Sequence, residues 1–250
     1  MKPEFNLHSD ETGSDYHIYT VAPSTAESSE VLPCILFMDG DDQFSAAAEA
    51  YRGLRKAKKV PPLLLVGVGY GASYSKPNNR RGRDYTPTHH SDEPTSGGAN
   101  AFLSFLAANL WPELQRRYRI DDSSRGIAGH SLGSLLVLHA LWHEPPFFNR
   151  FLASSPSIWW DDRSILRIAE DRHRRNSHLT GKLFLSVGEA DSKSMTGDLT
   201  LLKEWLERAP FSGLTVRTEL FRKRNHFNVL PDAFRAGLAA LYGSEDDVRE

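Results

Sequence analysis

The sequence contains a single cysteine, Cys34, among its 250 residues. One thiol cannot form a disulfide within the chain, which excludes the class of small secreted proteins that disulfides stabilise. Proteins that fold in oxidising compartments usually carry several cysteines. The scarcity of cysteine therefore favours a cytoplasmic protein.

Long apolar runs are also missing. The first six residues, MKPEFN, lack the apolar core of a signal peptide, and no later run comes near the roughly 20 apolar residues that cross a bilayer. We therefore expect a chain that neither spans a membrane nor carries an export signal, in agreement with a cytoplasmic location.

The sequence has no excess of charge of either sign, since 30 Lys and Arg residues face 32 Asp and Glu residues and give a formal net charge of -2. Nucleic-acid-binding proteins usually gather basic residues on one face. The basic residues are largely dispersed, with short clusters such as those at positions 80–83 and 172–175. The composition predicts a small-molecule substrate and no nucleic-acid or membrane partner.

Short apolar runs with high β-propensity alternate with amphipathic helical segments along the whole chain. Helical spacing of apolar residues marks segments 44–54, 102–118, 132–142, 202–206 and 234–241, and the expected strands are 17–21, 35–38, 63–68, 126–128, 151–153, 183–187 and 215–221. Strands that are apolar throughout are typical of a sheet covered on both faces. The pattern predicts one α/β domain over residues 1–250 with a mostly parallel sheet.

One segment interrupts this alternation. Residues 71–98 are polar, contain three prolines and exceed the roughly 12 to 15 residues beyond which an irregular connection is usually functional or disordered. We expect a long polar loop near the mouth of an active site.

A candidate nucleophile, Ser131, lies between Gly129 and Gly133 in the sequence GHSLG. A strand is expected before it and a helix after it, which is the setting of a nucleophile elbow. In that sharp turn the serine is strained, and side chains two residues away on either side would collide. The pentapeptide alone is weak evidence, but its setting favours a nucleophile over a tight structural turn.

A serine nucleophile needs a base, and in this fold the chain order is serine, acid, histidine. Of the ten histidines, five precede Ser131, two lie on the helix that follows it, and two lie in or beside an Arg-rich stretch. His226 remains, between the last expected strand and the last expected helix. The sequence therefore predicts His226 as the base, with simple solvent exposure as the alternative.

The acid is less well defined. The loop after strand 183–187 reads GEADSKS, in which Glu189 and Asp191 both lie at the carboxyl end of a strand. Asp191 is preferred because an aspartate a few residues into this loop matches the usual position of the acid. Glu189 is the alternative, and Asp161 and Asp162 stay open.

An oxyanion hole needs two backbone amides. The amide of Leu132 begins the helix after the serine, and the loop in MDGDD supplies the second donor, for which we predict the amide of Asp41. Gly40 would let that backbone approach closely. An ordinary Asp-Gly turn is the alternative reading of this loop.

Seven motifs appear in consecutive order along nearly the whole chain, namely FMDGDDQF, RRGRDYTP, GGANAFLSFL, YRIDDSSRGIAGHSLGSL, FLASSPSIWWDD, LFLSVGEAD and NHFNVLP. This set resembles the esterase branch of the α/β-hydrolase superfamily, and within it the trilactone-siderophore esterases of the enterobactin and bacillibactin type. The resemblance implies an α/β-hydrolase fold without a separate lid, with Ser131 and His226 as nucleophile and base and the amides near Asp41 and Leu132 as oxyanion hole. Some members of this branch resemble enzymes with a serine-histidine dyad and no third carboxylate. A merely supporting role for Asp191 is therefore the alternative.

The resulting expectation is a serine ester hydrolase that acts through an acyl-enzyme on a siderophore trilactone or a related ester or lactone. A general carboxylesterase or an acyltransferase on the same scaffold is the alternative, followed by a ligand-binding protein without turnover. The chemistry requires no cofactor. We expect no metal site either, because His89 and His90 are adjacent and have no ligand partner at a suitable spacing.

A ferric tris-catecholate is a large anion, so cations are expected at the rim of the site. Lys76, Arg80, Arg81 and Arg83 are the candidates on the long loop, with a solvated charged loop or a structural clasp around Arg83 as the alternative. Trp159 and Trp160 are candidates for stacking on an aromatic acyl group, although aromatic pairs at strand ends also pack as core or rim.

Overall fold

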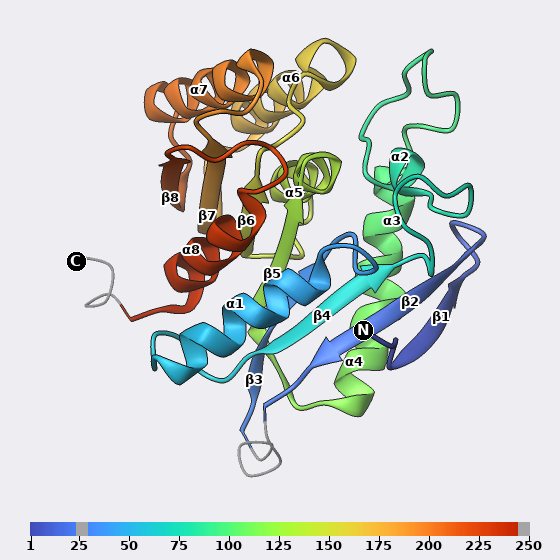
Figure 1. Cartoon of the computed structure of the whole chain (residues 1–250). Helices are drawn as coiled ribbons and strands as arrows, with labels where there is room; N and C mark the ends of the chain where they lie inside the picture. The colour runs from blue at the N-terminus through green and yellow to red at the C-terminus, as the bar shows by residue number, and fades with distance from the viewer. Residues whose placement is uncertain (24–29, 245–250) are drawn as a thin grey trace.

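A computed structural model describes residues 1–23 and 30–244 of the chain. Its eight strands form a single sheet in the order β1-β2-β4-β3-β5-β6-β7-β8 (Figure 1). The first two strands run antiparallel to their neighbours, and all later neighbours are parallel. The strands are β1 (Phe5–Ser9), β2 (Ser14–Val21), β3 (Leu32–Phe37), β4 (Leu64–Gly69), β5 (Ile120–His130), β6 (Arg150–Ser154), β7 (His178–Gly188) and β8 (Ser212–Phe221).

Helices cover both faces of the sheet. On one face, α1 and α8 pack against each other and enclose a core around Phe37, Phe44 and Phe234. The other face carries the remaining long helices and the larger core. The helices are α1 (Phe44–Lys56), α2 (Arg81–Asp84), α3 (Ala99–Phe105), the π-helix η1 (Leu106–Leu110), α4 (Trp111–Arg117), α5 (Leu132–Trp142), α6 (Trp160–Arg175), α7 (Lys193–Arg208) and α8 (Leu230–Tyr242).

The apolar strands of the sequence become the centre of this sheet. Every residue of β4 is buried, as are the last four residues of β3 and of β6. Helix α5 is apolar all round and lies buried between the sheet and its neighbours, since ten of its eleven residues are shielded from solvent. The prediction of an α/β-hydrolase fold with a mostly parallel sheet is confirmed.

Three elements differ from the sequence-based expectation. Strand β1 was not predicted, because FNLHS offers only two apolar positions and one of its faces is exposed. Helix α6 was not predicted either, since its second half is highly charged. The single helix expected over 102–118 is divided into α3, η1 and α4, and the division coincides with Pro112, which cannot donate a backbone hydrogen bond.

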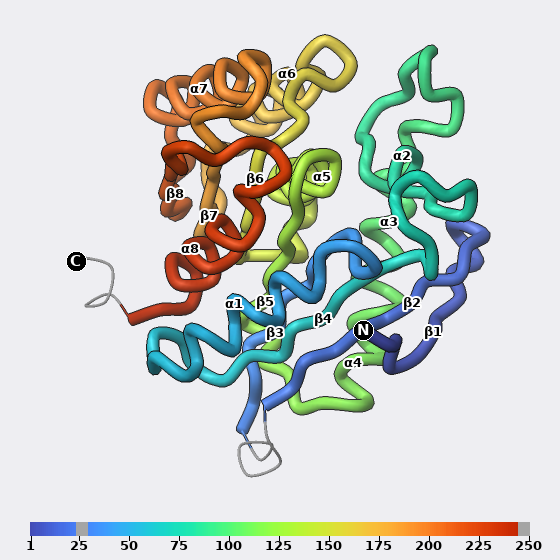
Figure 2. Tube along the Cα trace, in the orientation of Figure 1, coloured from blue at the N-terminus to red at the C-terminus, as the bar shows by residue number. Residues whose placement is uncertain are grey.

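The segment between β4 and α3 lies beyond the carboxyl edge of the sheet, beside the α2 and α3 labels (Figure 2). It contains the one-turn helix α2 and an isolated bridge between His90 and Glu93. Within residues 1–23 and 30–244, none of the helices is both long enough and apolar enough to cross a bilayer.

Candidate active site

Ser131 occupies the sharp turn between β5 and α5. Its φ of 59° and ψ of -122° place the backbone in a region that residues with a side chain rarely adopt. A Cβ atom on Gly129 would lie 2.3 Å from the backbone carbon of Gly133, so only glycine fits before this turn. The local sequence therefore folds into the elbow that its pattern predicts.

His226 and Asp191 lie side by side at the carboxyl edge of the sheet. The Nδ1 atom of His226 is 2.9 Å from Oδ2 of Asp191, and the second carboxylate oxygen accepts the amide hydrogen of Ser192 at 2.7 Å. Because an ionised carboxylate only accepts hydrogen bonds, Nδ1 of His226 carries the proton and Nε2 is left as the basic nitrogen. The Asp191 side chain is buried, whereas that of His226 is 22% exposed.

The other acids considered from the sequence have different partners. The carboxylate of Glu189 accepts the backbone amide of Lys223 at 3.1 Å, in the loop that precedes His226. Asp161 and Asp162 lie at the start of α6 and face Arg167 at 3.9 Å. Of the four acids, Asp191 is therefore the one paired with the imidazole.

The two predicted oxyanion donors lie on neighbouring segments. Leu132 is the first residue of α5, where an amide has no acceptor within its own helix. A Cβ atom on Gly133 would lie 3.2 Å from the Asp39 carboxylate, so the loop after β3 abuts the start of α5. The Asp41 carboxylate anchors that loop through the Tyr19 hydroxyl and two backbone amides, at 2.5 to 3.1 Å.

A cavity of about 450 Å³ opens at this edge of the sheet. Ser131 and His226 both line it, together with side chains from the loop after β3 and from the long segment after β4. The complete lining is Asp42, Gln43, Tyr74, Arg81, His130, Ser131, His226, Phe227 and Leu230. A serine, an imidazole held by a carboxylate, and a strained elbow thus meet at one cavity.

The sequence matches the profile of the family described as "Putative esterase" over residues 9–216. The chain belongs to this esterase family. It is 33% identical over 234 residues to ferri-bacillibactin esterase BesA of Bacillus subtilis, with 86% of this chain and 81% of that protein covered. It is 34% identical over 176 residues to siderophore triacetylfusarinine C esterase of Aspergillus fumigatus, with 67% of this chain and 59% of that protein covered.

Solved structures show the same fold. The BES protein from Bacillus cereus matches this esterase-family chain with a TM-score of 0.87 and 28% identity, over 96% of this chain and 94% of that one. Siderophore hydrolase EstB from Aspergillus nidulans matches with a TM-score of 0.82 and 24% identity, over 96% of this chain and 94% of that one. At this identity the similarity is one of fold.

Arg81 of this esterase-family chain lies at the cavity and also holds the loop after β3. Its guanidinium donates to both carboxylate oxygens of Asp39, at 2.8 and 3.1 Å, and lies over the rings of Tyr74 and Tyr85. Burial opposes the charge of the guanidinium, but the facing carboxylate outweighs that cost and raises the pKa of Arg81. The cavity is therefore bordered by an Arg81–Asp39 ion pair whose geometry is fixed.

The other predicted substrate-binding residues do not line this cavity. Arg83 is directed toward the β1–β2 hairpin, where it donates to the carbonyl of Thr12 and to Ser14 besides Asp84. Arg80 and Lys76 are exposed. Trp160 is buried and donates to the carbonyl of Thr88, whereas Trp159 is 45% exposed.

Several residues at the site were not predicted from the sequence. The ring of His130 lies 4.5 Å from that of His226, and burial, followed by the nearby His226, lowers the pKa of His130 to about 3. The hydroxyl of Ser157 is 3.4 Å from that of Ser131. Phe227 is 88% exposed beside His226. The only local signal was that His130 and Phe227 adjoin the predicted catalytic residues.

Within residues 1–23 and 30–244, no group of three or more His, Cys, Asp or Glu residues comes together in a way that would hold a metal ion. The candidate site is built from side chains and backbone amides.

Proposed function

We propose that this esterase-family chain is a serine ester hydrolase that opens the ester bonds of a siderophore trilactone. The observation that carries the proposal is the 2.9 Å hydrogen bond between His226 and Asp191 at the cavity lined by Ser131. This arrangement leaves Nε2 of His226 unprotonated and fixes the ring, as a base that activates a hydroxyl requires.

The proposed reaction passes through an acyl-enzyme. Ser131 Oγ attacks the ester carbonyl while His226 Nε2 accepts its proton, and the amides of Leu132 and Asp41 stabilise the oxyanion. The protonated imidazole then donates to the leaving alcohol, and water repeats the sequence on the acyl group. Asp191 keeps the ring oriented and stabilises its cation in both halves of the reaction.

His130 supports this cycle through its lack of charge. Burial first, and the proximity of His226 second, lower the pKa of His130 to about 3, so its ring is neutral at neutral pH. A neutral ring packed against His226 does not repel the imidazolium that forms when Ser131 loses its proton.

The lining of the cavity favours an aromatic substrate. Tyr74 and Phe227 present rings there that are 42% and 88% exposed, and the ring of a catecholate acyl group can pack against them. The guanidinium of Arg81 also lines the cavity, where Asp39 balances its charge. Relatives named as siderophore esterases point to the same substrate class.

A cytoplasmic location is part of the proposal. It rests on the single cysteine, which is buried and free of any disulfide. Cell fractionation with an antibody to the native chain tests it, and recovery of the protein outside the cytoplasm would contradict it.

The function is tested by incubating a catecholate trilactone, ferric and iron-free, with wild type and Ser131→Ala. Wild type is expected to release the linear trimer or smaller fragments, and Ser131→Ala to lose at least ~1,000-fold in turnover, as measured by mass spectrometry. Ser45→Ala is the matched control, because that serine is exposed on α1 and its activity should be unchanged.

Two results would contradict the proposal in different ways. Cleavage of a simple aryl ester with an intact trilactone would reject the siderophore substrate and keep the serine hydrolase. Turnover by Ser131→Ala within tenfold of wild type would reject Ser131 as nucleophile.

A further inference from the structure

The strand β8 forms one edge of the sheet and is unusually open for an edge. Within the described part of the chain it pairs with β7 and with no other strand. It is ten residues long, whereas β1 at the opposite edge has five. Natural edge strands are usually short or interrupted by proline or a bulge, and from Leu214 to Phe221 β8 has neither interruption.

Five residues of β8, centred on Thr218, form a segment that is complementary to its own reverse. Residues 216–220 read Val-Arg-Thr-Glu-Leu, so an apolar residue, a charge and a threonine are followed by the opposite charge and another apolar residue. Val216 and Leu220 are 38% and 55% exposed, although both are apolar. The side chains of Arg217 and Glu219 lie 3.9 Å apart on the other side of the strand and are 45% and 34% exposed.

Two copies of such a strand are complementary in one register. In an antiparallel pair, opposite residues point the same way, so a two-fold axis must pass through a residue position. An axis at Thr218 places Arg217 opposite Glu219 of the second copy and Val216 opposite Leu220 of the second copy. Moving the axis by one residue in either direction places two like charges opposite each other, which destabilises the pair.

We propose that β8 is a dimerisation edge, at which two copies of this chain pair antiparallel about a two-fold axis at Thr218. The charge pair and the apolar pair each occur twice by symmetry. Pairing satisfies the outward backbone groups of an otherwise open edge and covers two exposed apolar side chains. The inference concerns assembly and does not depend on the proposed function.

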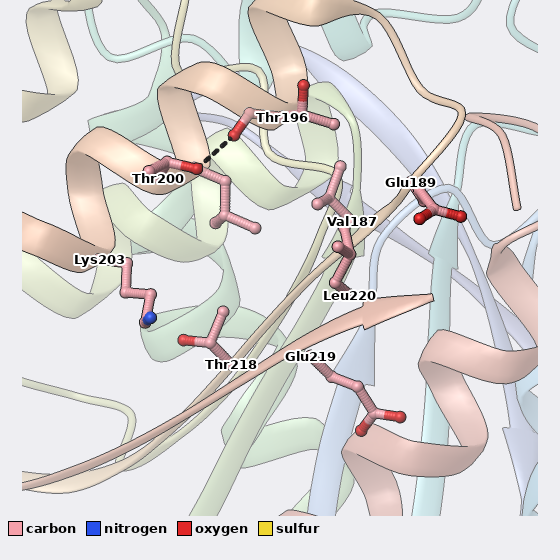
Figure 3. A pocket seen from close by; sticks show the side chains of 9 residues that line it. Val187, Glu189, Thr196, Thr200, Lys203, Thr218, Glu219 and Leu220 are labelled. Atoms are coloured by element: carbon pink, nitrogen blue, oxygen red, sulfur yellow. Dashed lines mark hydrogen bonds between the residues drawn. The ribbon is translucent and has the colours of Figure 1, made fainter. Parts of the chain in front are cut away.

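Hollows on both sides of the strand leave room for the second copy. One cavity of about 410 Å³ lies between β8 and α7, and Thr218 and Leu220 line it with Val187 (Figure 3). Another of about 460 Å³ lies between β8 and α8, and includes Arg217, Glu219 and Phe221 in its lining. Figure 3 shows Thr218 and Glu219 leaving opposite sides of the strand. Side chains of a second copy would occupy these two cavities.

A designed disulfide tests the register. Opposite Cα atoms in an antiparallel pair lie about 4.5 to 5.5 Å apart, within the range that a disulfide spans. In the Thr218→Cys variant, the new cysteines of the two copies should therefore form a disulfide with each other. The native Cys34 is fully buried and gives little background. Thr215→Cys is the matched control, because its two copies would lie six positions out of register, roughly 20 Å apart.

We expect mild oxidation to convert most of Thr218→Cys, and little of Thr215→Cys, to a covalent dimer on non-reducing gels. Equal cross-linking of the two variants, or none for Thr218→Cys, would overturn the proposal.

A charge swap tests the surface without a covalent bond. Analytical ultracentrifugation of wild type should give a reversible dimer, and Arg217→Glu should raise its dissociation constant by roughly tenfold or more, because two like-charge pairs replace two ion pairs. Glu219→Arg should do the same. The double variant R217E/E219R restores both pairs and should recover wild-type dimerisation.

Circular dichroism establishes that each of these variants is folded. A monomeric wild type at about 100 µM, a concentration that would reveal even a weak complex, would overturn the proposal. A double variant as weak as the singles would do so too.

Discussion

Asp191 and Glu189 stand two residues apart after β7, and their carboxylates serve different partners. Asp191 contacts the imidazole of His226 at 2.9 Å, whereas Glu189 accepts the amide of Lys223. The first contact sets the protonation of a ring nitrogen, and the second holds the loop that carries the ring. Asp191 thus orients the proposed base, whereas Glu189 holds the loop on which that base lies.

The exchange Asp191→Asn tests this division. Its side-chain amide retains the size of the carboxylate but no longer enforces the same tautomer of His226, so kcat on an aryl ester should fall by about 10³ to 10⁴. Glu189→Gln is the control and should lose less than about tenfold, since its oxygen still accepts the Lys223 amide. If the two variants lose activity equally, Asp191 does not orient the base.

At the scale of the element, the elbow depends on close contact between β5 and α5. The first turn of α5 packs so closely against the end of β5 that a Cβ atom on Gly129 would overlap the backbone of Gly133. That contact fixes where Ser131 and the Leu132 amide lie relative to the loop after β3. The geometry of the site is therefore a property of how one strand enters one helix.

Adding a single methyl group to the elbow should be costly. Gly129→Ala forces a Cβ to 2.3 Å from backbone that cannot move freely, and we expect a loss of about 1 to 3 kcal/mol in unfolding free energy. Activity should fall at least ~100-fold, because the nucleophile shifts with the turn.

Gly53→Ala on α1 is the matched control, since nothing lies within 4 Å of its Cβ position. This exposed helical site should gain about 0.5 to 1 kcal/mol. Chemical denaturation measures both stabilities, and a Gly129→Ala protein as stable and active as wild type would contradict the reading of the elbow.

At the scale of the whole molecule, buried histidines couple folding to pH. Burial, and then the neighbouring His143, lower the pKa of His139 to about 4, against an ordinary value of 6.5. Its Nε2 lies 2.8 Å from the side-chain oxygen of Asn100. Between pH 6.5 and 4 the unfolded chain binds a proton at this site that the folded chain does not, so acidification destabilises the fold.

The variant His139→Leu removes this proton linkage and leaves only the exposed Asn100 without its partner. When the pH falls from 7.5 to 5, wild type should lose about 2 kcal/mol more unfolding free energy than the variant, because the variant binds one fewer proton on unfolding. Urea denaturation at the two pH values measures the change. A stability difference that does not depend on pH would contradict the assignment.

The sequence by itself determined the fold class and predicted the candidate nucleophile and base. The alternation of apolar strands and amphipathic helices is a local pattern, and so are the glycines around Ser131 and the position of His226 after the last strand. Such local patterns can be recognised in a sequence because helices and strands have different periods and because glycine marks strained turns.

Only the tertiary structure decided which side chains meet. It paired Asp191 with His226, turned Arg83 toward the β1–β2 hairpin and joined Arg81 to Asp39, contacts that join residues 35 to 71 positions apart. Among the described residues, it also left β8 paired with β7 alone. Charged side chains have several partners within reach of any loop, and the choice among them depends on distances that the folded backbone sets.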